Sequence, residues 1–380
     1  MSRTPTKAET KDGALPEADR LDEFAHPREV SEYFGHGAAE QALLDAFNAN
    51  HLHHAWLFTG PEGIGKATLA YRFARFLLAH GSQGNEETGG MAIPTEHPVF
   101  GQVAALSHPN LLVLRRAWQP DRKRLATAIT VSEARRLRRF FGHTAGGDSA
   151  WRVVIIDRAD ELNGAAANAL LKNLEEPPAR CVFVLVCSAP GRLPITIRSR
   201  CRTLGFSPLG ESELEAAVSN AFENAQMKLP DTGRMQAALP LAQGSVGRAL
   251  QLLGAGGEDM HSRLVGLLGT LPDLDYQAVH GLADKLAAPG AEASYELFFS
   301  ITQEVFARMV THAATGNGAI AGEEALAARL KSPRALAQWA SLWETVRRAK
   351  AQADALNLDR KNLVLGTFFR LEQTARQALQ

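Results

Sequence analysis

Gly60-Pro-Glu-Gly-Ile-Gly-Lys-Ala-Thr68 is the stretch that decides the fold. A short apolar run, His54-Ala-Trp-Leu-Phe-Thr59, precedes it, and a strongly helical stretch from Ala67 to Ala79 follows it. A glycine-rich turn between a buried strand and a helix is the setting of a phosphate-binding loop, where backbone N–H groups, the helix N-terminus and a lysine face phosphate oxygens. The candidate nucleotide-binding residues here are Gly60, Gly63, Gly65, Lys66 and Thr68.

The residue after the lysine departs from the usual pattern of such loops. Ser or Thr normally stands there, and its hydroxyl binds Mg²⁺, whereas this chain has Ala67. Thr68 lies one step along the helix, about 100° around the axis, and points elsewhere. Mg²⁺-dependent hydrolysis should therefore suffer badly. Binding of ATP or ADP stays open, and any such binding is expected to depend only weakly on Mg²⁺.

Three further apolar runs predict strands, at Leu111–Leu114, Val153–Ile156 and Val182–Val186. The last two are rich in β-branched residues and nearly continuous, which is typical of parallel strands covered on both faces. Helical stretches at Val131–Phe141 and Ala165–Leu174 separate the runs. This alternation predicts right-handed βαβ crossovers and a doubly wound α/β sheet.

An acid ends one of these strands, in Val153-Val-Ile-Ile-Asp157. Asp157 would lie at the carboxyl edge of the sheet near the phosphate loop, as a further nucleotide-site candidate; the alternative is that it caps the following turn. Many ATPases of this type carry a glutamate next, which orients the attacking water. Here the next residue is Arg158, a cation that cannot act as a base. Together with Ala67, this change favours a former ATPase over an active one.

Strand signals stop after about Pro208, and only helical patterns follow. Residues 1–25 carry almost no large apolar side chains, which predicts a disordered leader. We therefore expect an α/β P-loop domain at 26–207, a small helical domain at 208–256 and a larger all-α domain at 257–380.

The composition is that of a globular protein, with 380 residues of which 45% are hydrophobic and 22% charged. The 41 basic and 41 acidic side chains balance, which argues against a protein that coats nucleic acid through bulk charge. Three cysteines fit a reducing cytosol. No apolar run reaches the roughly 18–20 residues of a membrane span. A cytoplasmic protein without a membrane partner is expected.

Several segments together resemble the AAA+ subunits of the bacterial DNA polymerase III clamp loader. They are Asp157-Arg-Ala-Asp-Glu-Leu162, Asn168-Ala-Leu-Leu-Lys-Asn-Leu-Glu-Glu-Pro-Pro178 and Leu193-Pro-Ile-Thr-Ile-Arg-Ser-Arg-Cys201. The C-terminal Asn357-Leu-Asp-Arg-Lys361 looks like the delta-prime group of these subunits. The resemblance is clear over residues 26–260 and weaker in the C-terminal third. It implies an AAA+ parallel-sheet domain, a small helical lid and an all-α collar domain for oligomerisation.

Departures from the ATP-hydrolysing gamma/tau subunits agree with the delta-prime group. Gamma/tau subunits keep the hydroxyl and the glutamate that Ala67 and Arg158 replace here, and they carry a sensor arginine where Gly244-Ser-Val-Gly247 ends in glycine. The resemblance implies a non-hydrolysing, stator-like subunit in a hetero-pentamer with gamma/tau and delta. The assembled pentamer would use ATP to load the sliding clamp on primer–template DNA. The alternatives are a gamma/tau-type ATPase and a stand-alone AAA+ remodelling ATPase, and Arg158 disfavours both.

Ser199-Arg200-Cys201 matches the family's arginine finger. The resemblance implies that Arg200 is catalytic in trans, at the nucleotide of a neighbouring subunit. A guanidinium suits this role because its planar fork binds phosphate oxygens bidentately and stays charged. The alternative is a surface arginine in a turn.

Thr130-Val-Ser-Glu133 is a capping-box pattern that opens a basic helix. Its arginines are Arg135, Arg136, Arg138 and Arg139. They form either a solvated face or, within a clamp loader, a contact with DNA phosphates.

Members of the family often carry a four-cysteine zinc module after the P-loop helix. Between His80 and Pro109 this chain has no cysteine, and its histidines there are too irregularly spaced to replace the module. We expect no zinc and no other metal site.

Overall fold

The computed structural model describes residues 16–80 except 19 and 22, residues 89–142 except 123, and residues 151–378 except 319, 321, 329–332 and 357. The chain divides into two compact units. The first comprises Met1–Leu229 with Gln243–Arg248, and the second comprises Pro230–Ala242 with Ala249–Gln380.

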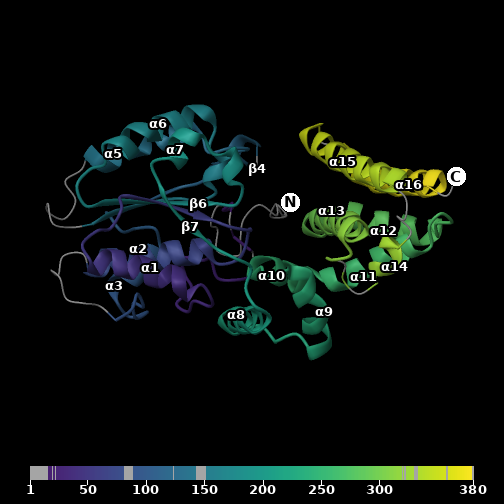
Figure 1. The fold of residues 1–380 in the computed structure, drawn as a ribbon, viewed down its shortest axis with the longest axis horizontal. Coiled ribbons are helices and arrows are strands. Elements are labelled where there is room, and N and C mark those ends of the chain that lie inside the picture. The colour runs from purple at the N-terminus through teal and green to yellow at the C-terminus, as the bar shows by residue number, and fades with distance from the viewer. Residues whose placement is uncertain are drawn as a thin grey trace, which may run out of the picture. The chain divides into compact units, whose positions relative to one another are not determined.

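A parallel five-stranded sheet forms the middle of the first unit (Figure 1). Its strands follow the order β2-β5-β6-β1-β7, and every neighbouring pair is parallel. The strand bounds are β1 Ala55–Thr59, β2 Leu111–Leu114, β5 Arg152–Ile156, β6 Cys181–Cys187 and β7 Arg202–Gly205. A short antiparallel hairpin consists of β3 (Trp118–Gln119) and β4 (Arg124–Leu125). The four apolar runs are all strands, and the predicted α/β class is confirmed.

Helices cover both faces of this sheet (Figure 1). On one face lie α1 (Gly37–Asn48), α2 (Lys66–His80) and α3 (Pro98–Ala104); on the other lie α5 (Arg136–Gly142), α6 (Gly164–Glu175) and α7 (Ile195–Arg198). Along β1, Trp56 and Phe58 pack into the core beneath α1 and α2, whereas Ala55 and Leu57 join the core beneath α6 and α7. Because both faces are buried, the strands read as continuous apolar runs rather than as alternating ones.

The edge strand β7 escaped prediction. It pairs with β1 alone, and three of its four residues are exposed. An edge strand of this kind carries no apolar run, so Arg202–Gly205 has the pattern of a turn.

Ordered packing begins before residue 25. Residues 1–15 of the predicted leader lie outside the described residues, but Glu17 accepts hydrogen bonds of 2.7 and 3.2 Å from the Arg28 guanidinium and also pairs with Arg115. Phe24 is buried against Phe222, with ring centroids 5.1 Å apart. The prediction of disorder up to residue 25 is therefore wrong for the described part, because partners distant in sequence supply the missing contacts.

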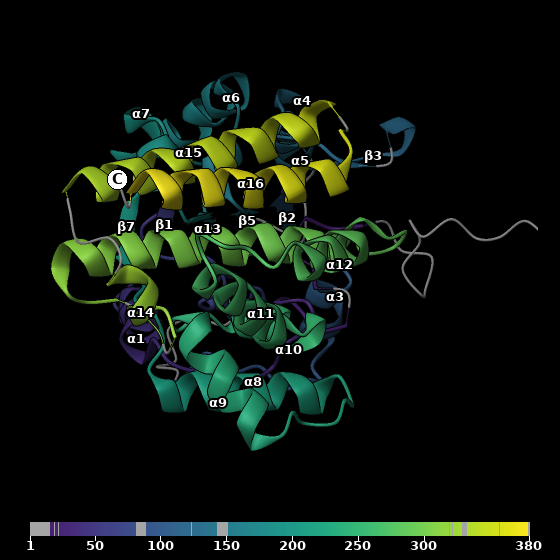
Figure 2. The ribbon, with the colours of Figure 1, turned by 90° about the vertical axis from the view of Figure 1, so that its right-hand side faces the viewer.

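The other α-helices of the described residues lie mostly in the C-terminal half of the chain. The bounds are α4 Val131–Ala134, α8 Glu211–Asn224, α9 Thr232–Ala242, α10 Val246–Ala255, α11 Gly257–Gly269, α12 Tyr276–Ala287, α13 Glu292–Thr315, α14 Glu324–Ala327, α15 Pro333–Leu356 and α16 Arg360–Ala378. Figure 2 shows α15 and α16 side by side along the second unit. The helical C-terminal region agrees with the sequence, whereas the domain boundaries at 207/208 and 256/257 stay predictions.

No helix of the described ranges combines the length and apolar character that a bilayer crossing requires.

Candidate functional site

The glycine-rich loop between β1 and α2 has the backbone that only glycines adopt readily. Gly60, Gly63 and Gly65 have φ angles of 150°, 76° and 103°, in the region that L side chains avoid. At Gly60 an ideal Cβ would lie 2.4 Å from the carbonyl oxygen of Phe206. The loop conformation therefore depends on these glycines.

Lys66 begins α2 and is only 3% exposed. Its Nζ donates to the carbonyl oxygen of Gly60 at 2.6 Å, to that of Pro61, and to Ser188 Oγ at 3.1 Å. Burial lowers the pKa of the ammonium to about 8, although nearby acidic side chains favour its charged form. The ammonium is satisfied by its own loop, and phosphate oxygens could replace these carbonyl groups as charged and therefore stronger acceptors.

Asp157 follows β5 and is 4% exposed, and Arg158 beside it has a left-handed backbone with φ 56°. The Arg158 guanidinium pairs with Glu62 of the phosphate loop and, at 3.4 Å, with Glu161. Burial opposes the charge of Arg158, but the two carboxylates outweigh it and raise the pKa of the guanidinium. The position after Asp157 thus holds a permanent cation tied to the loop, which cannot take a proton from water.

These residues fit a nucleotide phosphate better than a Mg²⁺ ion. The glycine loop, Lys66 and the N-terminus of the 15-residue helix α2 together form an anion site. Ala67 offers no oxygen ligand, and Thr68 is half-buried one step further along α2. Within the described ranges, no group of three or more His, Cys, Asp or Glu side chains is placed to hold a metal ion.

The stretch Gly244–Gly247, which is distant in sequence from the phosphate loop, forms hydrogen bonds with it. Ser245 Oγ donates to the carbonyl oxygen of Glu62 at 2.8 Å, and the Gly247 N–H donates to the carbonyl oxygen of Gly63 at 3.0 Å. An ideal Cβ on Gly63 would lie 2.4 Å from Ser245 Oγ and 3.2 Å from the Gly247 Cα. Glycine at position 247 therefore permits a direct contact between two backbones.

Sequence reasoning missed several of these groups. Only Ser188 had a signal, as the first polar residue after the apolar run of β6. Glu62 and Ser245 act through partners far away in the sequence. Tyr33 was also missed: its ring would lie 3.5 Å from an ideal Cβ on Gly65, and its buried hydroxyl has no hydrogen-bond partner among the described residues.

We expect Gly63→Ala to lower the free energy of unfolding by at least about 1–2 kcal/mol, the usual cost of the left-handed conformation for an L residue. The new methyl group would also displace Ser245 from Glu62. Chemical denaturation of the full chain measures the loss. Gly37→Ala is the control, because Gly37 has no positive φ and no atom within 4 Å of an ideal Cβ; equal losses in both variants would contradict the expectation.

Arg200 lies in the turn between α7 and β7, with its side chain 35% exposed. Its Nη2 pairs with Glu175 at 2.7 Å, and its Nη1 donates to the carbonyl oxygen of Thr196 at 2.8 Å and to Ser199 Oγ at 3.5 Å. Among the described residues, no hydrogen bond or ion pair joins Arg200 to the phosphate loop of its own chain. Arg200 is therefore not part of the hydrogen-bonded arrangement around the phosphate loop.

The predicted basic helix is divided in two, α4 and α5, with a turn at Arg135. Its capping box does not form: the Thr130 hydroxyl contacts Ser132 Oγ at 2.6 Å, and Glu133 pairs with Arg136 at 2.7 Å instead. All four arginines are exposed: Arg135, Arg136, Arg138 and Arg139.

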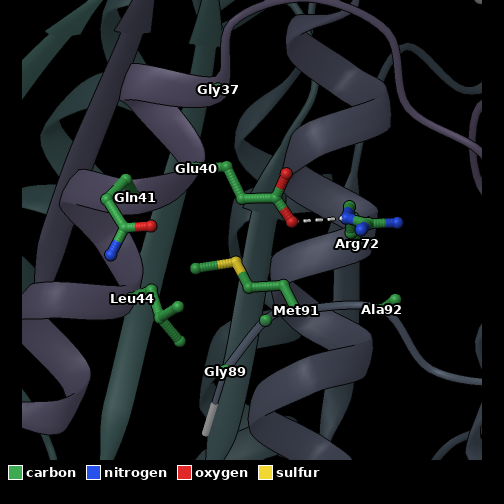
Figure 3. Close-up of a pocket in the computed structure, with 9 residues that line it drawn as sticks. Gly37, Glu40, Gln41, Leu44, Arg72, Gly89, Met91 and Ala92 are labelled. Carbon is green, nitrogen blue, oxygen red and sulfur yellow. Dashed lines mark hydrogen bonds and ion pairs between the residues drawn. The ribbon is translucent and has the colours of Figure 1, made fainter.

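A separate cavity of about 290 Å³ lies between α1, α2 and residues 89–92 (Figure 3). Glu40 and Arg72 form an ion pair of 2.7 Å there, and Leu44 and Met91 supply apolar walls. The lining shares no residue with the phosphate loop, so we assign no nucleotide to this cavity.

Residues 35–210 match the family model described as DNA polymerase III, delta subunit. The delta' subunit of Escherichia coli K12 is 33% identical over 213 residues, which cover 56% of this chain and 58% of that protein. The delta' subunit of Bacillus subtilis 168 is 33% identical over 175 residues, or 46% and 48%. The gamma/tau subunit of Mycobacterium tuberculosis H37Rv is 30% identical over 285 residues, or 72% and 46%. The chain spans less than two thirds of the length of the first curated relatives it matches, from 34% to 60% among them.

Proposed function

We propose, from the match of residues 35–210 to the family model of the DNA polymerase III delta subunit and from the similarity to delta' subunits, that this chain is a non-hydrolysing delta-prime subunit of a clamp loader. The observation that carries the proposal is the pair between Arg158 and Glu62. Arg158, a cation, stands directly after Asp157, where an ATP-hydrolysing subunit has a glutamate that orients the attacking water. Relatives of the gamma/tau kind match the chain as well, so the choice between the two subunits depends on these residues.

Two further features support a chain without turnover of its own. Ala67 cannot supply the hydroxyl ligand of Mg²⁺. Gly247 stands where gamma/tau subunits carry a sensor arginine, and its N–H is bonded to the loop at 3.0 Å. If a nucleotide binds, the loop N–H groups and Lys66 would hold its phosphates. The phosphate oxygens would then accept from Lys66 Nζ in place of the carbonyl oxygens of Gly60 and Pro61.

In the proposed assembly this chain joins gamma/tau and delta in a hetero-pentamer through its helical C-terminal domain. The gamma/tau subunits hydrolyse ATP, Arg200 completes one of their sites in trans, and the ring places the sliding clamp on primed DNA. The exposed arginines of α4 and α5 are candidates for DNA phosphates in this assembly. Arg136 is the weakest of them, because Glu133 already neutralises it.

The purified chain alone should release phosphate from ATP no faster than a Lys66→Ala variant does, and it should co-purify with gamma/tau and delta. Phosphate release and size-exclusion chromatography measure the two properties. Turnover at rates typical of AAA+ enzymes, lost in Lys66→Ala, would support the gamma/tau alternative. The same turnover without co-purification would support a stand-alone remodelling ATPase.

A further inference from the structure

Helix α6 ends at a fixed place, immediately after Glu175. Glu176 caps the helix with φ −124° and ψ 73°, and Pro177 and Pro178 follow it. Two prolines cannot continue an α-helix. The Glu-Glu-Pro-Pro motif therefore holds the Glu175 carboxylate at the C-terminal turn of α6.

A carboxylate at this end of a helix is unfavourable by itself. The C-terminus carries the negative end of the helix dipole, where an acid costs about 0.3–1 kcal/mol rather than contributing stability. Glu175 is also 47% exposed, and ion pairs at such sites contribute only about 0–1 kcal/mol. Stability of the fold therefore gives little reason for an acid at this position.

Glu175 does supply one of two anchors for the Arg200 guanidinium. Its Oε1 lies 2.7 Å from Nη2, while the carbonyl oxygen of Thr196 in α7 accepts from Nη1 at 2.8 Å. Because the two acceptors come from different helices, they fix the plane of the guanidinium. Within the described part of the chain, the Nε–H of Arg200 makes no hydrogen bond, and Nη2, which carries two N–H groups, has only the pair with Glu175. Donors on both nitrogens therefore remain for an external acceptor.

We propose that Glu175 is a positioning residue, which orients Arg200 toward the terminal phosphate of a nucleoside triphosphate held by a neighbouring subunit. The inference rests on the proposed function and adds a second residue to it. Orientation matters because a donor misplaced by about 1 Å can cost roughly 100-fold in rate. The fork of a guanidinium is rigid in itself, so the direction of its donors is set by the contacts that hold the whole group.

The test uses Glu175→Ala in the fully assembled complex, with ATP hydrolysis measured as kcat and KM. We expect kcat at the adjacent site to fall by up to about 100-fold, by less than in Arg200→Ala, with KM for ATP unchanged. Thermal stability of the chain should stay the same or rise slightly, because an unfavourable helix-end charge is removed. Glu175→Gln should restore part of the rate, since it keeps a polar oxygen at the position of Oε1, 2.7 Å from Nη2, without the charge.

Glu176→Ala is the matched control, because this neighbouring exposed carboxylate has no ion pair with Arg200, and it should hydrolyse like wild type. In an Arg200→Ala background, Glu175→Ala should have no further effect. If Glu175→Ala leaves kcat unchanged, or slows hydrolysis equally without Arg200, positioning is wrong while the finger stands. If Arg200→Ala itself has no effect, the finger and the positioning role both fail.

Discussion

Arg200→Ala is expected to slow ATP hydrolysis at the gamma/tau site beside this chain and to impair clamp loading, without loss of folding or ring assembly. The side chain is 35% exposed and its ion pair with Glu175 lies at the surface, so truncation should cost no more than about 1 kcal/mol of stability. A finger supplied in trans is worth about 10³–10⁵ in rate in GTPases. We expect a loss near the lower end of that range at the single affected site, and a smaller loss in the steady-state rate of a ring whose other sites still turn over.

The measurement is ATP hydrolysis and clamp loading by the reassembled complex. Arg200→Lys should restore activity only in part, because lysine supplies the charge without the bidentate fork. Arg192→Ala is the control, as Arg192 is an exposed arginine in the same segment of the chain. Wild-type hydrolysis and loading by the Arg200→Ala complex would contradict the role of Arg200 as a finger in trans.

Glu323→Ala is expected to lower the free energy of unfolding of the second unit by about 3–5 kcal/mol, the usual cost of breaking a buried ion pair. Glu323 is fully buried and accepts hydrogen bonds from His261 at 2.8 Å and from Arg308 at 2.7 and 2.9 Å. Both partners are 6% exposed, so truncation would leave the buried Arg308 guanidinium with only its longer ion pair to Glu304, at 3.7 Å. Denaturation followed by circular dichroism measures the loss, with the exposed Glu324→Ala as control.

The stability that Glu323 contributes should also depend on pH. Burial alone would raise the pKa of this carboxyl, but the hydrogen bonds from His261 and Arg308 outweigh burial and lower it from the ordinary value near 4.5. The contribution is therefore complete above that ordinary value and is lost as the pH falls through the lower pKa of the folded state. The difference in stability between wild type and Glu323→Ala should narrow below about pH 4; a difference that stays constant to pH 2 would contradict this account.

The fold was predictable where a buried strand requires a continuous run of apolar residues. The four strands with apolar runs are buried on both faces, and each shows a run of large aliphatic or aromatic residues. β7 has one strand partner and exposed side chains, so its pairing depends on β1 rather than on its own composition. The ordered packing of Glu17 and Phe24 was not predicted for the same reason. A local sequence pattern does not reveal their partners, which are Arg28, Arg115 and Phe222.

In the candidate site, too, residues within one sequence motif were predicted, whereas residues whose partners are distant in sequence were not. The glycines and Lys66 were predictable because they stand in one continuous motif, where the positive φ angles and the start of α2 are properties of the local backbone. Glu62 was not predicted, because its pairing with Arg158 depends on the sheet. The sheet places the C-terminal ends of β1 and β5 on the same edge, with β6 between them. The capping box at Thr130 failed because Glu133 found a stronger, charged partner in Arg136.

The pair between Arg158 and Glu62 also constrains the mutational paths open to this chain. Arg158→Glu, the change that would supply a water-orienting group, would place a third carboxylate beside Glu62 and Glu161, where like charges repel. Changing Glu62 first would remove a carboxylate that pairs with Arg158. The effects of substitutions at the two positions are therefore expected to be coupled rather than additive, and Ala67 would still lack a hydroxyl.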